Sequence, residues 1–556
     1  GGMVSKRAQF AFALMPNVRF EKPEDAHYRF SLVTQMGADN SKYTVDFYNS
    51  DFSKIQNVQM SKRNENDRNS ATNMVYGIEK NNISYIRISD EKATGILLPK
   101  PKIQQSNSNF TFAIDFGTSN THVVCKSDNA KTGSMEITQT DMQVNVGPTG
   151  KNVPVQTIEP IFRVLCPETI GEGCLSRFPM RSALSVGRNT NWNKSFFAFG
   201  QANYAFLYEK KAVPKYNDVI TNLKWSNDSD NVNKIKCFIE SLFFVLRNKV
   251  VLNDGRLDNV KIIWTYPLSM TLARCDQFKQ VWEDAYKKFF SADVDSNLFD
   301  INESVAPYYY YKAKQNNVSN IVTIDIGGGT SDIVIANHNE IKCITSFRFA
   351  SNTLFGDLNE NNEGELSGIV SQFANKIESK LKENSLSVIE SIYNDLKNKN
   401  NSADIASFFF SLKDNKDLTD KKIDIDFSSE LQRDTKQKIS FLIFYCAIIY
   451  HLAKLMKAKQ LEMPRHIGFS GNGAKVINIL TPNKKLLENL TKRIFERIYQ
   501  TDYPSDGLSV ILMDTPKEAT SMGAIMGRRD DYDEINAKKT VLLGTDSNTF
   551  ADSYKY

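Results

Sequence analysis

The segment Ile114-Asp-Phe-Gly-Thr-Ser-Asn-Thr-His-Val-Val124 decides the fold, because Ile324-Asp-Ile-Gly-Gly-Gly-Thr-Ser-Asp-Ile-Val334 repeats its plan later in the chain. Each segment predicts a short apolar strand ending in Asp, a tight turn of Gly, Ser and Thr, and a second apolar strand. Such a turn offers several backbone N–H groups to one phosphate, and the Asp can orient a hydrated divalent cation. Two copies indicate a duplicated α/β unit whose turns clasp one nucleoside triphosphate from opposite sides.

The bulk composition is that of an ordinary globular chain. Its 556 residues are 41% hydrophobic and 24% charged, which predicts ample core and about three to four domains. The net charge of +5 predicts neither a nucleic-acid partner nor a strongly acidic one. The seven cysteines are odd in number and scattered, so we expect a reducing, cytoplasmic setting without disulfides or a zinc site.

We expect no signal peptide and no membrane span. The apolar run at residues 8–15 is short and meets Pro16, which favours a first β-strand. The most apolar helix candidate, Ile439–Met456, carries His451 and Lys454 and is better interpreted as a buried core helix.

The patterning divides the chain into four parts. Residues 3–108 alternate apolar and polar side chains and predict a small all-β module. Strands then alternate with amphipathic helices, which predicts α/β lobes at 109–310 and 311–527, the second with a helical insertion. Residues 528–556 are polar and predict an extended tail. The α/β strands are expected near 111–115, 121–125, 261–265, 320–325, 332–336 and 466–470, and helices near Lys234–Asn248, Ala273–Phe290, Leu366–Asn384 and Lys436–Lys457.

Five landmarks between residues 110 and 527 carry a family resemblance. In chain order they are Ile114–Asn120, Ile263-Trp-Thr-Tyr-Pro267, Ile301-Asn-Glu-Ser-Val-Ala306, Ile324–Asp332, and the pair Gly468-Phe-Ser-Gly-Asn-Gly473 and Lys517-Glu-Ala-Thr-Ser-Met-Gly523-Ala524. Together they resemble the actin and heat-shock protein 70 ATPase superfamily, most closely the nucleotide-binding domain of DnaK-type heat-shock protein 70 chaperones. The resemblance implies a two-lobed actin-like ATPase fold of duplicated ribonuclease-H-like units, preceded here by the all-β module.

The resemblance also implies the site residues. Asp115 and Asp325 would hold, through water, the Mg²⁺ that bridges the phosphates of ATP or ADP. Lys224 matches the family's catalytic lysine, Glu303 would position the attacking water, and Asp332 would polarise water near the γ-phosphate. The phosphate cradle would comprise Gly117, Thr118, Ser119 and Asn120 from one turn and Gly327, Gly328, Gly329 and Thr330 from the other, with Asp325 and Thr330 also counted as catalytic.

The adenosine side of the site departs from the family pattern. Its loop would comprise Ser470, Gly471, Asn472, Gly473 and Lys475. Family members place an arginine where this chain has Ala474, so the resemblance leaves open whether Lys475 replaces the missing guanidinium.

These residues predict a heat-shock protein 70-like ATPase that uses lobe closure as a conformational switch on a partner or client protein. The partner is unknown, and the all-β module is a candidate docking site for it. A nucleotide-dependent, filament-forming bacterial actin is the alternative. A small-molecule kinase of the same superfamily is less favoured, because Glu303 lies in a chaperone-like sequence context.

Overall fold

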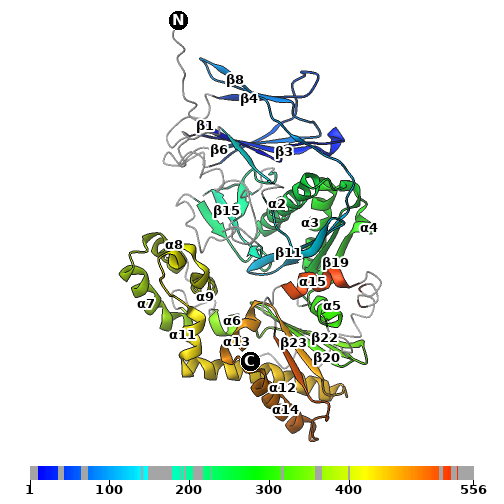
Figure 1. Ribbon diagram of the computed structural model, residues 1–556, viewed down its shortest axis with the longest axis vertical. Helices are drawn as coiled ribbons and strands as arrows, with labels where there is room; N and C mark the ends of the chain where they lie inside the picture. The colour runs from blue at the N-terminus through cyan, green and yellow to red at the C-terminus, as the bar shows by residue number, and fades with distance from the viewer. Residues whose placement is uncertain are drawn as a thin grey trace.

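The computed structural model describes most of the chain. The described residues are 10–34, 43–63, 73–138, 142–147, 178–187, 190–192, 196–204, 217–226, 228–268, 270–314, 319–356, 366–398, 401–512 and 518–527, with Tyr532 and Ile535. The rest of the predicted tail at 528–556 lies outside them. Figure 1 shows the N-terminal strands at one end, a first mixed sheet in the middle, and a second mixed sheet at the other end with a group of helices beside it.

The two mixed sheets have the same strand order. Both contain three neighbouring antiparallel strands followed by two parallel ones, so the repeat seen in the sequence is a repeat of the fold. The mixed α/β class predicted from the sequence is confirmed. The first sheet runs β12 (Ala130–Ser134), β11 (Asn120–Ser127), β10 (Phe110–Phe116), β18 (Lys261–Tyr266) and β19 (Leu298–Asn302); the second runs β22 (Glu340–Phe347), β21 (Ser331–Asn337), β20 (Ile321–Ile326), β23 (His466–Ser470) and β24 (Ser509–Leu512).

The two glycine-bearing turns occupy equivalent positions in these sheets. Asp115 pairs with His122 across β10 and β11, and Asp325 pairs with Asp332 across β20 and β21. The last pairs of these ladders are Phe116 with Thr121 and Ile326 with Ser331, and the turns at 117–120 and 327–330 join the paired strands. Each Asp is therefore the last residue but one of the central strand of its sheet, just before the turn.

Amphipathic helices cover both sheets, as the 3.6-residue periodicity predicts. Helices α2 (Asn231–Leu252) and α3 (Leu272–Phe289) lie together against the first sheet, and α12 (Thr435–Ala458) and α14 (Lys484–Tyr499) against the second (Figure 1). A separate helical group has its own apolar core, centred on Ile405 and Phe409. It comprises α7 (Gly368–Glu383), α8 (Ser387–Asn398), α9 (Ser402–Ser411), α10 (Lys416–Asp420) and α11 (Phe427–Arg433).

The N-terminal strands form two sheets that pack face to face, with Phe30 of one sheet against Phe47 of the other. One has the order β13-β1-β3-β6-β5 and the other β4-β7-β8. Strand β13 lies beyond the boundary predicted after residue 108, and it pairs Gly147 with Phe12. The strands are β1 (Phe10–Met15), β3 (His27–Thr34), β4 (Thr44–Tyr48), β5 (Gln59–Arg63), β6 (Asn73–Glu79), β7 (Tyr85–Ser89), β8 (Thr94–Leu97) and β13 (Asn145–Gly147).

One hydrophobic core runs from these N-terminal sheets into the first mixed sheet and its helices, from Phe30 to Trp282. Two buried guanidinium groups cross the junction. Arg29 of β3 donates from Nε to the carbonyl of Ala198 at 2.6 Å. Arg247 of α2 places its Cζ 4.7 Å from the ring centroid of Phe20, in the N-terminal region. The N-terminal strands and the first mixed sheet therefore share a single core.

Two helices lie between the mixed sheets (Figure 1). Helix α5 (Val305–Lys314) follows β19, and α15 (Glu518–Met526) lies against it. Their apolar cluster includes Val124 from the first sheet and Val334 from the second. At Gly523 the backbones approach so closely that a Cβ would lie 1.8 Å from the carbonyl oxygen of Ala306.

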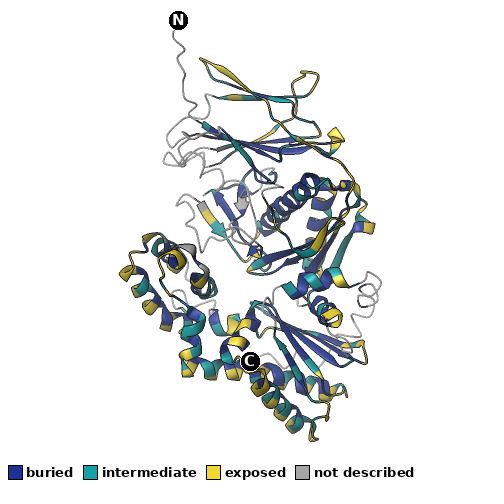
Figure 2. Cartoon of the chain, in the orientation of Figure 1, coloured by how far each residue is buried: buried dark blue, intermediate teal, exposed yellow. Residues whose placement is uncertain are grey.

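Helix α12 is the one described helix long and apolar enough to cross a membrane, with a mean hydropathy of 1.8 in its most apolar window. Phe444 and Ile448 are buried against the second sheet. The opposite face is exposed, by 54% at Ile439 and 63% at Ile443 (Figure 2). The predicted buried core helix is thus buried on one face only.

Replacing Gly523 by Ala should destabilise the protein, because the new methyl group cannot fit against the Ala306 carbonyl without moving α15 from α5. We expect a loss of about 2–4 kcal/mol in the free energy of unfolding, measured by urea denaturation. Gly368→Ala is the matched control, since Gly368 begins α7 and a Cβ added there would have no atom within 4 Å. It should be neutral or slightly stabilising, and equal losses in both variants would contradict the close packing of the two helices.

Candidate functional site: a cleft between the two sheets

A cleft between the two mixed sheets gathers both turns. None of its lining residues comes from the N-terminal strands. The first sheet and its connections supply Asp115, Gly117, Thr118, Ser119, Asn120, Arg181, Lys224, Trp225 and Glu303. The second sheet, the helical group and α15 supply Asp325, Gly327, Gly328, Thr330, Asp332, Ser351, Asn352, Phe355, Ala403, Ala406, Ser407, Phe410, Gly471, Asn472, Gly473, Lys475, Val476 and Thr520.

The structure brings together nearly all the residues that the sequence singled out. Only Gly329 and Ser470 among them do not line the cleft. Ser470 lies behind it and donates from Oγ to Oδ2 of Asp325 at 3.0 Å. The roles assigned to these residues stay predictions, whereas their proximity is a property of the fold.

Asp325 is fixed from two directions. In addition to Ser470, Thr520 of α15 donates from Oγ1 to the same carboxylate oxygen at 2.9 Å. Gly471 follows β23 with φ +79°, and a Cβ there would lie 2.5 Å from Oδ1 of Asp325 and 2.3 Å from the carbonyl oxygen of Ile326. Glycine is therefore required for both the backbone conformation and the space.

Asp332 is a buried carboxyl group in an acidic neighbourhood. Ser304 donates to its Oδ1 at 3.2 Å and Thr330 to its Oδ2 at 3.1 Å. Burial, together with the nearby carboxylates of Glu303 and Asp325, raises the pKa of Asp332 to about 7. A carboxyl group with this pKa changes its charge near neutral pH.

Lys224 and Glu303 form a close ion pair on the first-sheet side. Lys224 Nζ lies 2.5 Å from Oε1 and 3.0 Å from Oε2 of Glu303. The lysine is 2% exposed, so the solvated surface position that is common for lysine does not apply here. Glu303 stands at the junction of β19 and α5, where its N–H donates to the carbonyl of Tyr266 at 2.9 Å.

The first turn is held in shape by Ser182. The Ser182 N–H donates to the carbonyl of Ser119 at 2.9 Å, and its Oγ donates to the carbonyl of Gly117 at 2.7 Å. On the other side, the indole N–H of Trp225 donates to Oγ1 of Thr118 at 2.9 Å. The sequence did not predict that Ser182 and Trp225 contact the first turn, although Trp225 directly follows the predicted Lys224.

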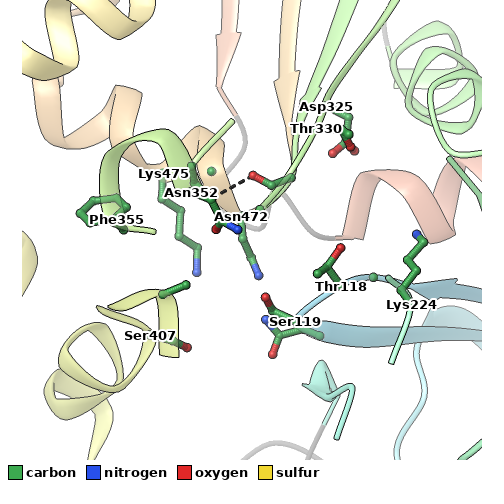
Figure 3. Close-up of a pocket in the computed structure, with 18 of the residues that line it drawn as sticks. Thr118, Ser119, Lys224, Asp325, Thr330, Asn352, Phe355, Ser407, Asn472 and Lys475 are labelled. Atoms are coloured by element: carbon green, nitrogen blue, oxygen red, sulfur yellow. Dashed lines mark hydrogen bonds between the residues drawn. The ribbon is translucent and has the colours of Figure 1, made fainter. Parts of the chain in front are cut away.

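The far end of the cleft is apolar and aromatic. Phe355 and Phe410 meet edge to face with ring centroids 5.5 Å apart, and Ala406 and Val476 complete this end. Figure 3 shows Phe355, Lys475 and Ser407 on one side of the cleft and Asp325, Thr330 and Lys224 on the other, with Thr118 and Ser119 between them. The cleft thus has a charged end and an apolar end.

Arg181 bridges the two sides of this apolar end. It belongs to β14 (Met180–Arg181), which pairs with β11 at Asn120. Its Nη2 lies 2.5 Å from Oδ1 of Asp404 on α9, and the Arg181 and Asp404 side chains are 3% and 13% exposed. No local signal in the sequence identifies Arg181, Phe355 or Phe410, because the chain fold alone brings them to the cleft.

The charged end suits a hydrated divalent cation. Asp115 and Asp325 present carboxylates from equivalent strand ends, and carboxylate oxygens are the ligands that Mg²⁺ prefers. Within the described residues, no group of three or more His, Cys, Asp or Glu side chains is arranged to hold a metal ion directly. The residues therefore fit a cation held through water and phosphate oxygens rather than in a protein cage.

Comparisons with known proteins reach only distant structural similarity. No family model and no curated protein sequence matches the chain. Among solved structures, MreB5 of Spiroplasma citri bound to ADP is 12% identical over 77% of this chain and 98% of its own, with a TM-score of 0.34. The AMPPNP-bound form of that protein (14%, 78% and 99%, TM-score 0.30) and the ethanolamine utilization protein EutJ from Carboxydothermus hydrogenoformans (11%, 75% and 90%, TM-score 0.29) are similarly distant. At these values the similarities assign no family, ligand or activity to the chain, and the heat-shock protein 70 resemblance stays a prediction.

The raised pKa of Asp332 predicts a stability that depends on pH. The charged form of Asp332 is disfavoured in the folded protein. This charge therefore lowers the free energy of unfolding by nothing below the ordinary pKa of 3.8, and by its full amount once the pH exceeds about 7. Asp332→Asn should therefore leave the free energy of unfolding unchanged at acidic pH and raise it by roughly 1–3 kcal/mol at pH 8. Urea denaturation at several pH values measures this difference.

Asp46→Asn provides a control of opposite sign. Burial raises the pKa of Asp46, but its ion pairs with Lys54 and Arg87 outweigh burial and lower it. That variant should lose stability at neutral pH. A gain for Asp332→Asn that is the same at every pH would contradict the assignment.

Proposed function

We propose that this protein binds Mg-ATP in the cleft between its two mixed sheets, hydrolyses it slowly, and belongs to the actin-like ATPases. The observation that carries the proposal is the pairing of the two turns. Each turn follows a strand-terminal carboxylate, Asp115 or Asp325, at the same register of equivalent sheets. An asymmetric pocket built for a single small metabolite has no need for two copies of one phosphate-binding element.

The charges of the cleft support the same ligand. Asp115, Glu303, Asp325 and Asp332 meet at one end, where Lys224 is the basic side chain bound among them. Carboxylates gathered in a poorly solvated place need cations. Mg²⁺ would supply this compensation and neutralise charge on the phosphates, while the turn N–H groups receive the phosphate oxygens.

Hydrolysis needs a positioned water and a place for its proton. Glu303 is oriented by Lys224 and can hold the water by hydrogen bonding. Asp332, with its pKa near 7, can accept the proton that the water loses when it attacks phosphorus. Lys224 lines the same end of the cleft, and in this proposal its ammonium stabilises charge on the transferring phosphoryl group.

The apolar end supports a nucleobase as the other half of the ligand. Phe355 and Phe410 offer aromatic surface, and Asn352 and Ser407 offer polar groups beside it. In this proposal these rings supply the contact with the base that family members make with an arginine where this chain has Ala474, and Lys475 lines the same cleft. Aromatic contact is worth about 1–3 kcal/mol for a stacked base.

Two outputs remain open for the ATPase: lobe closure that acts on a partner or client protein, and nucleotide-dependent self-assembly. One observation favours the second. The exposed apolar residues Ile439, Leu442, Ile443 and Tyr450 lie along one face of α12, and an exposed apolar patch on a helix is a common feature of association surfaces. The all-β N-terminal strands remain a candidate docking site for a partner, and we propose the cytoplasm as the protein's location.

Self-assembly predicts that light scattering and the pelleted fraction rise when Mg-ATP or a non-hydrolysable analogue is added. Ile443→Lys should reduce both at least severalfold without changing nucleotide affinity, because Ile443 is 63% exposed and far in sequence from the turns. Scattering that never rises with nucleotide would exclude this output and leave the partner-directed switch.

Phosphate release by the purified protein at saturating Mg-ATP tests the ATPase itself. Lys224→Met should lower kcat by about 100- to 1,000-fold, since it removes charge stabilisation of the transition state. Its affinity for Mg-ATP should change much less.

Asp325→Ala is the companion variant. It should weaken Mg-ATP binding by about tenfold or more, because the cation loses one of its two opposed carboxylates. Calorimetry measures both affinities. Unchanged binding by a folded Asp325→Ala protein would refute the assignment of the turns.

A further inference from the structure

Trp225 holds a position that the ATPase proposal leaves without a role. It lines the cleft next to Lys224, and its indole N–H reaches across to the first turn to donate to Thr118 Oγ1 at 2.9 Å. The contact therefore joins two elements that are more than a hundred residues apart in the sequence and that both face the charged end of the cleft.

The loop that carries Trp225 is braced on several sides. Asn231 of α2 donates from Nδ2 to the carbonyls of Leu223 at 2.9 Å and Ser226 at 3.0 Å. Arg274 of α3 donates from Nη2 to the same Ser226 carbonyl at 2.9 Å. Because the loop is tied to two helices, the backbone that carries Trp225 is held independently of the first turn, which Ser182 holds from the other side.

The chemistry of the contact fixes the direction of the Thr118 hydroxyl. An indole N–H can only donate, so Thr118 Oγ1 must accept. The hydroxyl proton is then left to point elsewhere, and no other hydrogen bond of this hydroxyl is formed within the described residues. A phosphate oxygen is an acceptor that cannot donate, so it is the matching partner for that proton.

We propose that Trp225 is a positioning residue for phosphate binding: it sets the Thr118 hydroxyl as a donor to a phosphate of the bound nucleotide and fixes the first turn relative to Lys224. This inference rests on the proposed nucleotide function. Trp225 acts through Thr118 and need not touch the phosphate itself.

The same geometry makes Trp225 a built-in reporter. Trp192, Trp264 and Trp282 are buried, with exposures of 8%, 3% and 0%, whereas Trp225 is partly exposed and lines the cleft. Nucleotide that engages Thr118 should therefore change the emission of Trp225 in particular.

The test is a double-mutant cycle in the full chain with Trp225→Phe, Thr118→Val and the double variant. Phenylalanine keeps an aromatic ring and removes the donor. We expect each single variant to raise the Kd for Mg-ATP and Mg-ADP about fivefold to twentyfold, and the double variant to be no weaker than Thr118→Val. Adenosine, which has no phosphate, should bind all variants equally, and Trp225→Phe should lose the nucleotide-dependent change in tryptophan fluorescence.

Each outcome has a distinct meaning. If the folded Trp225→Phe protein binds Mg-ATP and Mg-ADP as tightly as the wild type does, the inference about Trp225 is wrong but the proposed function is not affected. Penalties that simply add in the double variant also overturn it, because Trp225 would then act independently of Thr118. A wild-type protein that binds no Mg-ATP overturns the proposed function together with this inference, and measurement of the wild type first separates that failure from the other two.

Discussion

The architecture depends on how closely two helices can approach. Helices α5 and α15 lie between the mixed sheets, and their contact at Gly523 leaves no room even for a methyl group beside the Ala306 carbonyl. This spacing determines where the central strands of the two sheets end relative to each other. Because Asp115 and Asp325 close those strands, the same spacing sets the width of the charged end of the cleft. Thr520, on the same helix as Gly523, then fixes Asp325 directly by hydrogen bonding.

The charged end is electrostatically incomplete by itself. Its carboxylates come close enough for Glu303 and Asp325 to raise the pKa of Asp332, and the lysine among them is already bound to Glu303. Burial of like charges costs free energy that packing elsewhere must offset. This unfavourable cluster lies where the Mg²⁺ of a bound Mg-nucleotide would relieve the repulsion between the carboxylates, and such clusters are expected at binding sites.

Local chemistry explains what could be predicted from the sequence. Alternating apolar residues, a strand-ending Asp and a glycine-rich turn are all properties of neighbouring residues, so the strands at 110–116 and 321–326 and the residues of both turns could be identified. Ser470 was expected in the ligand surface but supports Asp325 from behind, which depends on strand register. The sequence did not place Arg181, Phe355 and Phe410, because long-range topology alone brings a short strand and two helices to the cleft. Trp225 directly follows Lys224, but its contact with Thr118 depends on the same topology. Similarly, the composition of α12 did not reveal that one of its apolar faces is exposed.

Strand β13 adds a consequence for how the molecule assembles. The N-terminal sheet is completed by residues 145–147, which the ribosome supplies only after the central hairpin of the first mixed sheet. Arg29 and His27 of β3 then join this sheet to later parts of the chain: Arg29 donates to the carbonyl of Ala198, and the ring of His27 packs against Phe289. Contacts of such sequence separation are slow to form. The first half of the chain is therefore expected to be a single cooperative folding unit that cannot mature during synthesis until about residue 290 has emerged, and its N-terminal strands must stay protected from aggregation until then.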